Sequence, residues 1–106
     1  MTTFDLGPAD LADGAIRAAT AGERELAVAR LGDRHVAFEL WCPHDECPLS
    51  DGWLEGSAIR CACHGALFDL DDGTPIEGPT DDSIDVFPAA VDSEGRIVAE
   101  IPILPA

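Results

Sequence analysis

Two short segments hold every cysteine of this chain and two of its three histidines. The first reads Cys-Pro-His-Asp-Glu-Cys from Cys42 to Cys47, and the second reads Cys-Ala-Cys-His-Gly from Cys61 to Gly65. Random scatter of six such residues would seldom produce this clustering, and buried structural cysteines do not require it. The pattern indicates a metal centre to which two separate loops contribute ligands.

The spacing of these residues narrows the kind of metal centre. The ligand types run as C-x-H, then sixteen residues, then C-x-x-H. A C2H2 zinc finger would place two cysteines before two histidines on a ββα unit, and a plant-type ferredoxin would need four thiolates. Two thiolates and two imidazoles instead fit a [2Fe–2S] centre with the cysteines on one iron and the histidines on the other. A zinc-binding or purely structural interaction module is the alternative.

The rest of the chain predicts an all-β fold. Short β-like runs alternate with turn residues, and none shows a sustained helical period. Strands are expected at residues 2–6, 15–20, 25–31, 35–39, 57–60, 66–70, 84–91 and 96–101. Residues 92–95 predict a hairpin turn, and residues 8–12 a single helical turn. The length suffices for one domain, residues 1–106, with a loop-built metal-binding part at about 40–79.

The charge balance limits the partners. Twenty-one acidic residues oppose six basic ones, all arginine, for a formal net charge of −15. Phosphate backbones and anionic lipid repel such a chain, so we expect neither nucleic acid nor a membrane as a partner. Residues 1–5 hold no basic stretch and no apolar run follows them, which predicts a cytoplasmic protein. We expect a monomer that is steered onto basic protein surfaces.

The two segments resemble the cluster-binding loops of the Rieske iron–sulfur family. The resemblance continues through residues 48–52 and 65–69, and the proline-containing stretch 73–79 is similar to the family's third loop, which covers the cluster. It implies an antiparallel barrel or sandwich base with a loop-built cluster-binding subdomain. The ligands that it implies are Cys42 and Cys61 for the inner iron, and His44 and His64, with imidazole edges toward solvent, for the outer iron.

The remaining two cysteines are Cys47 and Cys63. They stand where respiratory Rieske proteins of the cytochrome bc complexes carry a disulfide, a pair that most ferredoxins of ring-hydroxylating oxygenases lack. The resemblance implies a disulfide that clamps the two loops, with free thiols packed under the loops as the alternative. Ala66 and Phe68 stand where respiratory proteins have hydroxyl donors to sulfur. Since neither side chain can donate, we expect a cluster potential at the low end of the Rieske range.

The resemblance as a whole implies a Rieske ferredoxin of an aromatic-ring oxygenase system. Such a protein is a one-electron carrier without catalytic residues, which passes electrons from a flavin-dependent reductase to a terminal oxygenase. A small Rieske-fold subunit of a larger oxidoreductase, such as nitrite reductase, is the alternative.

The surroundings of the two loops predict a docking surface. We expect Trp41 and Trp53 to pack under the loops, and His35, in a strand-like run, not to be a ligand. Small, charge-steered interfaces are typical of electron-transfer encounters, which gives the acidic residues around the loops a role beyond solubility. These residues are Asp45, Glu46, Asp51, Glu55, Asp69, Asp71, Asp72, Glu77, Asp81 and Asp82.

Overall fold

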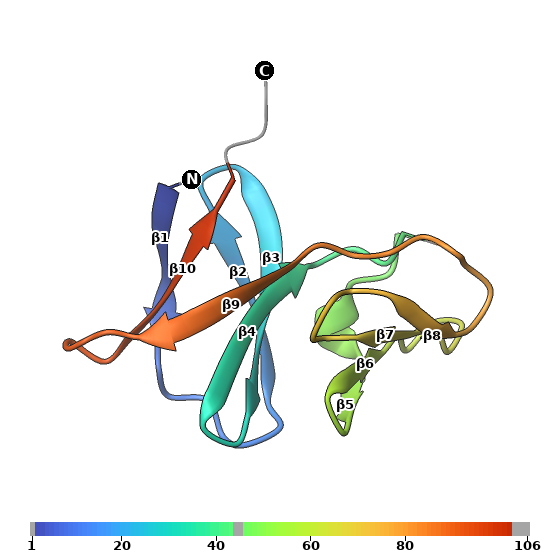
Figure 1. Cartoon of the computed structure of the whole chain (residues 1–106), viewed down its shortest axis with the longest axis horizontal. Coiled ribbons are helices and arrows are strands. Elements are labelled where there is room, and N and C mark those ends of the chain that lie inside the picture. The colour runs from blue at the N-terminus through green and yellow to red at the C-terminus, as the bar shows by residue number, and fades with distance from the viewer. Residues whose placement is uncertain (1, 44–45, 103–106) are drawn as a thin grey trace.

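The computed structural model describes residues 2–43 and 46–102. Within them the chain forms two antiparallel sheets and one short 3-10 helix, Leu49–Asp51 (Figure 1). The strands are, in chain order, β1 (Thr2–Pro8), β2 (Ile16–Ala21), β3 (Arg24–Leu31), β4 (Arg34–Glu39), β5 (Trp53–Glu55), β6 (Ala58–Arg60), β7 (Leu67–Asp69), β8 (Pro75–Glu77), β9 (Val86–Val91) and β10 (Arg96–Ile101). The larger sheet, in the order β1-β10-β9-β4-β3-β2, is a nearly closed barrel, and the smaller sheet has the order β5-β6-β7-β8. The predicted all-β class is confirmed.

Alternating side chains fill the barrel. β3 directs Leu26 and Val28 inward, where they pack with apolar residues of β1, β4 and β10. Its other two buried residues, Ala27 and Ala29, belong to the core on the opposite face. Because β3 is buried on both faces, its apolar run is continuous rather than alternating with polar residues.

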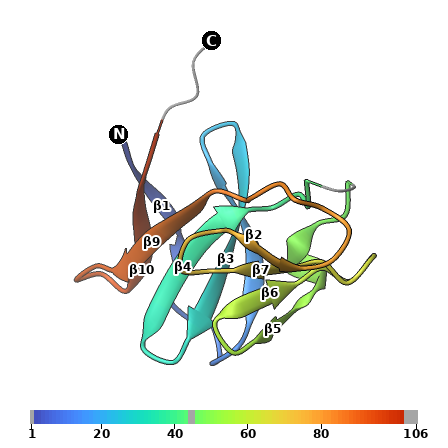
Figure 2. The ribbon, with the colours of Figure 1, turned by 45° about the vertical axis from the view of Figure 1, so that its right-hand side comes forward.

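The second sheet is inserted between β4 and β9 and lies beside β4 in both views (Figures 1 and 2). Phe38 of β4, Ile59 of β6 and Phe68 of β7 belong to one cluster of buried residues. The same cluster takes in Cys42 and Cys61. The cysteines expected to bind iron are therefore anchored in a core that the two sheets share.

The predicted hairpin at residues 92–95 is confirmed between β9 and β10. The carboxylate of Asp92 accepts hydrogen bonds from the backbone N–H groups of Glu94 and Arg96, each at 2.9 Å. Gly95 completes the turn with a φ of 75°, which glycine adopts without steric cost. The turn is thus held by its own side chains, which is why the local sequence predicts it.

The single helical turn predicted at residues 8–12 is wrong. β1 runs on to Pro8, and the residues after it form no helix. Arg17 donates to the Pro8 carbonyl at 2.9 Å, and the N–H of Ala9 donates to the carbonyl of Gly95 at 2.8 Å. Because groups distant in sequence already form hydrogen bonds with this backbone, a helical turn would add no stabilising hydrogen bond to these groups.

Two strands of the second sheet, β5 and β8, are missing from the prediction, whereas β6 and β7, which are equally short, are included in it. A run of three residues is too short to show a period. The other strands lie within two residues of their predicted bounds. Among the described residues, no helix is long and apolar enough to cross a membrane.

Candidate metal centre

The first loop leaves β4 and closes on itself through backbone hydrogen bonds. The N–H of Cys42 donates to the carbonyl of Cys47 at 3.0 Å, and the residues that flank these two cysteines, Trp41 and Pro48, form an isolated β-bridge. Cys42 is buried, with 3% of its surface exposed, and Cys47 is 8% exposed. The loop thus turns both cysteines inward. The predicted ligand His44 and its neighbour Asp45 lie outside the described residues.

The second loop joins β6 to β7 as a tight turn. The N–H of Cys61 donates to the carbonyl of Ala66 at 2.7 Å, and the N–H of Gly65 donates to the carbonyl of Cys61 at 3.1 Å. Gly65 has a φ of 77°, a conformation that a residue with a Cβ rarely adopts. The turn therefore buries Cys61 at 1% exposure and leaves His64 exposed.

A disulfide between Cys47 and Cys63 joins the two loops, which confirms the predicted bridge. The two Cα atoms are 6.3 Å apart, within the range that a disulfide spans without backbone movement. The Sγ atom of Cys61 lies within 4.8 Å of both bridged sulfurs. Since a disulfide sulfur is not a thiolate, this group of three does not itself form a metal site. Cys42 and Cys61 are the two cysteines outside the bridge.

The third loop passes close over the second. Gly78, with a φ of 113°, approaches so closely that a Cβ there would stand 2.6 Å from the Cα of Ala66. Gly73 makes a similar approach to Ile84, whose N–H donates to the Gly73 carbonyl at 2.9 Å. Only glycine fits either position, and through Gly78 the stretch 73–79 packs against the turn that holds Cys61. That this stretch covers the cluster stays a prediction.

Arg60 links the second loop to the small sheet. Its guanidinium donates from Nε and Nη2 to the two carboxylate oxygens of Glu55, each at 2.8 Å, and from Nη1 to the carbonyl of Gly65 at 2.7 Å. The hydrogen bond from Arg60, followed by that from the indole of Trp53, lowers the pKa of Glu55 to about 2. The sequence-based prediction of the site does not include Arg60, although its position directly before Cys61 is a usable signal.

A family comparison decides which centre these loops belong to. The family of the Rieske [2Fe-2S] domain matches residues 3–88. The chain belongs to the Rieske [2Fe–2S] family. The predicted cofactor, a Rieske-type [2Fe–2S] cluster, is confirmed by this match, and the zinc-binding alternative is not supported.

Individual relatives agree with membership in the Rieske family. Ferredoxin CarAc of Metapseudomonas resinovorans is 37% identical over 89 residues, which span 83% of this chain and 82% of that protein. A chain in the complex of reduced oxygenase and oxidized ferredoxin in carbazole 1,9a-dioxygenase superposes with a TM-score of 0.83 at 33% identity, covering 92% of this chain and 91% of that one. The ferredoxin of carbazole 1,9a-dioxygenase from Nocardioides aromaticivorans IC177 has a TM-score of 0.85 at 27% identity, with coverage of 93% and 97%.

The tryptophans of this Rieske chain do not pack under the loops, so that prediction is wrong. Trp41 is 43% exposed and Trp53 is 51% exposed. The indole N–H of Trp41 donates to Glu25 at 3.3 Å, and that of Trp53 donates to Glu55 at 2.8 Å. Each ring is held on the outside by a surface carboxylate, because the small core under the loops is already filled by aliphatic and phenylalanine side chains.

Two of the acidic residues predicted around the loops, Glu46 and Asp71, have different surroundings. Glu46, in the first loop, lines a hollow of about 390 Å³ together with Trp41 and Glu25. Asp71 follows the end of β7 that is opposite to the second loop, and its carboxylate pairs with Arg34 at 2.6 Å. Asp71 is thus bound to the barrel, whereas Glu46 lies beside the metal centre.

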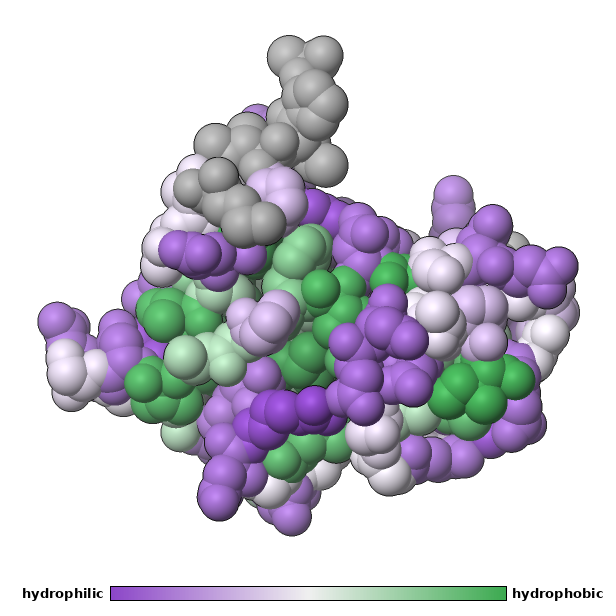
Figure 3. All heavy atoms as spheres, in the orientation of Figure 1, coloured by the Kyte–Doolittle hydropathy of each residue, from purple (hydrophilic) through white to green (hydrophobic). Residues whose placement is uncertain are grey.

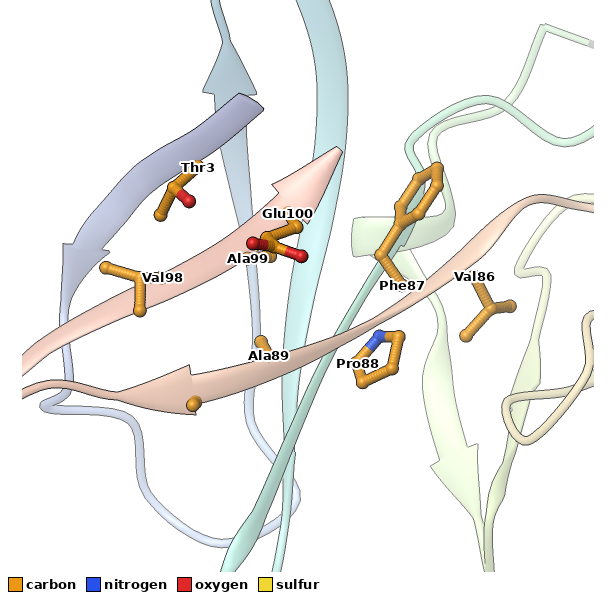
Figure 4. Close-up of a pocket in the computed structure, with 9 residues that line it drawn as sticks. Thr3, Val86, Phe87, Pro88, Ala89, Val98, Ala99 and Glu100 are labelled. Atoms are coloured by element: carbon orange, nitrogen blue, oxygen red, sulfur yellow. The ribbon is translucent and has the colours of Figure 1, made fainter. Parts of the chain in front are cut away.

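A hollow of the described part of the molecule lies on the barrel, outside both loops. It has a volume of about 760 Å³ and is bordered by residues that include Thr3, Pro88, Val98 and Glu100 (Figure 4). Figure 3 shows apolar residues gathered over this face among hydrophilic ones. Among the described residues that border it, Glu100 alone is charged.

Ala66 and Phe68 are both fully buried, at 0% exposure. Neither has a hydroxyl, so the low cluster potential expected from them stays a prediction. His35 lies in β4, where burial, and after it the charge of Arg30, lowers the pKa of the imidazole. It belongs to the barrel and not to either loop.

Proposed function

We propose that this chain is a one-electron carrier that holds its Rieske cluster through Cys42, His44, Cys61 and His64. The observation that carries the proposal is the division of the four cysteines. Cys47 and Cys63 form a disulfide between the loops. The other cysteine of each loop, Cys42 or Cys61, is buried and lies outside the disulfide. Two buried thiols and exposed imidazole fit the donor set of a Rieske centre, with the sulfur side inside and the imidazole side at the surface.

His44 enters this ligand set from its spacing and the family pattern, since it lies outside the described residues. We further propose that residues 1–106 form a single domain in which about 40–79 bind the cluster. A Rieske cluster held by these residues would supply one-electron redox chemistry. The chain keeps water from the two cysteines by burying them, and it leaves the His64 turn open to a partner.

The proposed partners are a flavin-dependent ferredoxin reductase, which supplies the electron, and a terminal oxygenase, which receives it. Ferredoxin CarAc and the chain in the oxygenase–ferredoxin complex support this placement, since they are 37% and 33% identical to this chain. The chain itself transforms no substrate in this scheme. We propose a cytoplasmic monomer that binds neither nucleic acid nor a membrane, in accord with its net charge of −15.

The surface beside the first loop suits a basic partner. Trp41, Glu25 and Glu46 border the same hollow next to Cys42. An exposed indole flanked by carboxylates attracts a cationic side chain through both charge and the face of the ring. We propose that arginine or lysine residues of the reductase or oxygenase meet the ferredoxin on this side.

The ligand set is tested by single replacements in the purified protein. Cys42→Ser, Cys61→Ser, His44→Ala and His64→Ala should each abolish the visible and EPR spectra of the Rieske cluster. His35→Ala is the matched control and should retain both spectra. A histidine variant that keeps the wild-type spectra would remove that residue from the ligand set.

The carrier function is tested by electron transfer. The chain is mixed without oxygen with a flavin-dependent reductase and NADH, and then with an oxidised terminal oxygenase, both taken from its gene neighbourhood. We expect bleaching and recovery of its visible spectrum at one electron per chain. A chain that carries the cluster but exchanges no electron with either protein would contradict the carrier role and would favour a subunit role in a larger enzyme.

A further inference from the structure

One arginine stands apart from the other five. Arg17, Arg24, Arg30, Arg34 and Arg96 all belong to strands of the barrel, and Arg60 is the one arginine of the second sheet. It is the last residue of β6 and directly precedes Cys61. The chain has six basic and twenty-one acidic residues, so a guanidinium beside Cys61 is uncommon in it, and the contacts of Arg60 indicate its role.

The guanidinium of Arg60 is held from several sides. Nε and Nη2 form a two-pronged pair with the carboxylate of Glu55, each contact at 2.8 Å, and Nη1 lies 3.5 Å from the carboxylate of Glu77. The indole N–H of Trp53 donates at 2.8 Å to Oε2 of Glu55, the same oxygen that accepts from Nε of Arg60. A planar fork in this arrangement has a single orientation, which a lysine ammonium would lack.

The remaining contact of Arg60 reaches the second loop. Nη1 donates at 2.7 Å to the carbonyl of Gly65, the residue directly after His64. The N–H of Gly65 is already engaged with the carbonyl of Cys61, at 3.1 Å. Arg60 therefore fixes the Gly65–Ala66 peptide group from outside the loop, whereas the His64–Gly65 peptide group is held by a hydrogen bond within the loop.

We propose that Arg60 is a positioning residue for the Rieske cluster, which acts through the Gly65 carbonyl to hold the His64 turn in one conformation. The inference rests on the proposed ligand set, in which Cys61 and His64 belong to this turn. Residues that orient a metal ligand without touching the metal act in this way in other centres, where their loss commonly weakens metal binding. Glu55, gripped by Arg60 and Trp53, anchors the fork to β5.

The charge of Arg60 has a second, separable effect. A cluster that takes up an electron is disfavoured by nearby negative charge and favoured by positive charge. Arg60→Gln would leave Glu55 and Glu77 without their cation, and Glu55→Gln would leave Arg60 with one anion fewer. These two replacements both break the fork, but they change the charge near the cluster in opposite directions.

The experiment compares four variants of the cluster-loaded protein: R60K, R60Q, E55Q and the control R34Q. Arg34 pairs with Asp71 at the far end of β7, so its loss removes a surface ion pair without touching the His64 turn. Three quantities are measured: the EPR line shape of the reduced protein, the midpoint potential, and the rate of cluster loss in the presence of an iron chelator.

We expect broadened EPR lines and about tenfold faster cluster loss in R60K, R60Q and E55Q. The midpoint potential should fall in R60Q, rise in E55Q and stay near the wild-type value in R60K. R34Q should match the wild type in line shape, potential and cluster lifetime. Opposite potential shifts in two variants with the same broadening would not arise from a general loss of stability.

A wild-type line shape and cluster lifetime in R60K and E55Q would overturn the positioning role, whatever their potentials. Potentials that shift in the same direction in R60Q and E55Q would overturn the electrostatic part. If R60Q fails to take up the cluster, the line shapes and cluster lifetimes of R60K and E55Q still test the positioning role. A His64→Ala protein that kept the Rieske spectrum would instead contradict the proposed ligand set, an outcome distinct from both.

Discussion

The two sheets of this molecule are stabilised in different ways. The barrel has strands of six to eight residues that close around their own apolar core. The second sheet has strands of three residues each, and its core is shared with the outer face of the barrel and with Cys42 and Cys61. Strands this short make few ladder hydrogen bonds, so the disulfide and, in the proposed ligand set, the cluster take a larger part in holding them.

This difference separates the fold from the function. The barrel provides a rigid surface on which the second sheet rests. The second sheet and its loops contain a close glycine contact between Gly78 and Ala66, the disulfide, and the hydrogen bonds of Arg60. Functional side chains are commonly placed on loops that a rigid scaffold supports.

The largest effect is expected from removal of the cluster, which should disrupt the second sheet and leave the barrel folded. Removing the cluster by His64→Ala or Cys61→Ser should abolish redox activity completely, because both residues belong to the proposed ligand set. Amide hydrogen exchange should show lost protection in β5 to β8, with the protection of β3 and β10 retained. Equal loss of protection in both sheets would mean that the barrel also depends on the cluster.

Next in size are large-to-small replacements in the two cores. Leu26→Ala in the barrel and Ile59→Ala under the loops each remove a fully buried side chain and should each cost about 2–5 kcal/mol in the free energy of unfolding. Only Ile59→Ala should also speed cluster loss. Chemical denaturation and chelator-induced bleaching measure the two quantities, with the exposed Val91→Ala as the control. Faster cluster loss in Leu26→Ala would show that the two cores act as one.

The disulfide has an intermediate effect. Replacing Cys47 and Cys63 together by Ser removes a link between residues sixteen positions apart, which costs about 3 kcal/mol in the chain-entropy account. We expect this loss to appear as easier opening of the two loops and a shorter cluster lifetime, with the barrel unchanged. As a check on the bridge, the denatured wild-type apoprotein should titrate as two thiols without reductant. Four thiols would contradict the disulfide.

The smallest effect concerns docking. Electron transfer with the reductase should slow as salt rises, since screening shortens electrostatic reach to about 8 Å at physiological ionic strength and about 3 Å at 1 M. Glu46→Gln should lower the association rate and flatten its salt dependence. Asp71→Asn, whose carboxylate is paired with Arg34 away from the loops, should have a smaller effect. Stopped-flow reduction at several salt concentrations measures this dependence. A rate independent of salt would limit the acidic surface to a role in solubility.

The features that the sequence alone determined are those set by neighbouring residues. The cysteine–histidine pattern that predicts a metal centre depends on side-chain chemistry at fixed spacing, and the barrel strands depend on the apolar pattern over six or more residues. The β9–β10 hairpin is specified by Asp92 and Gly95, which close the turn with their own atoms. Such signals survive without knowledge of the rest of the chain.

Tertiary structure decided what depends on distant partners. Residues 8–12 form no helix because Arg17 and Gly95 satisfy the backbone there. Trp41 and Trp53 lie outside because other side chains already fill the space beneath the loops. The proposed positioning role of Arg60 depends on contacts of its guanidinium with Glu55, Glu77 and Gly65. These groups come together only in the folded chain, so the sequence alone does not predict the role.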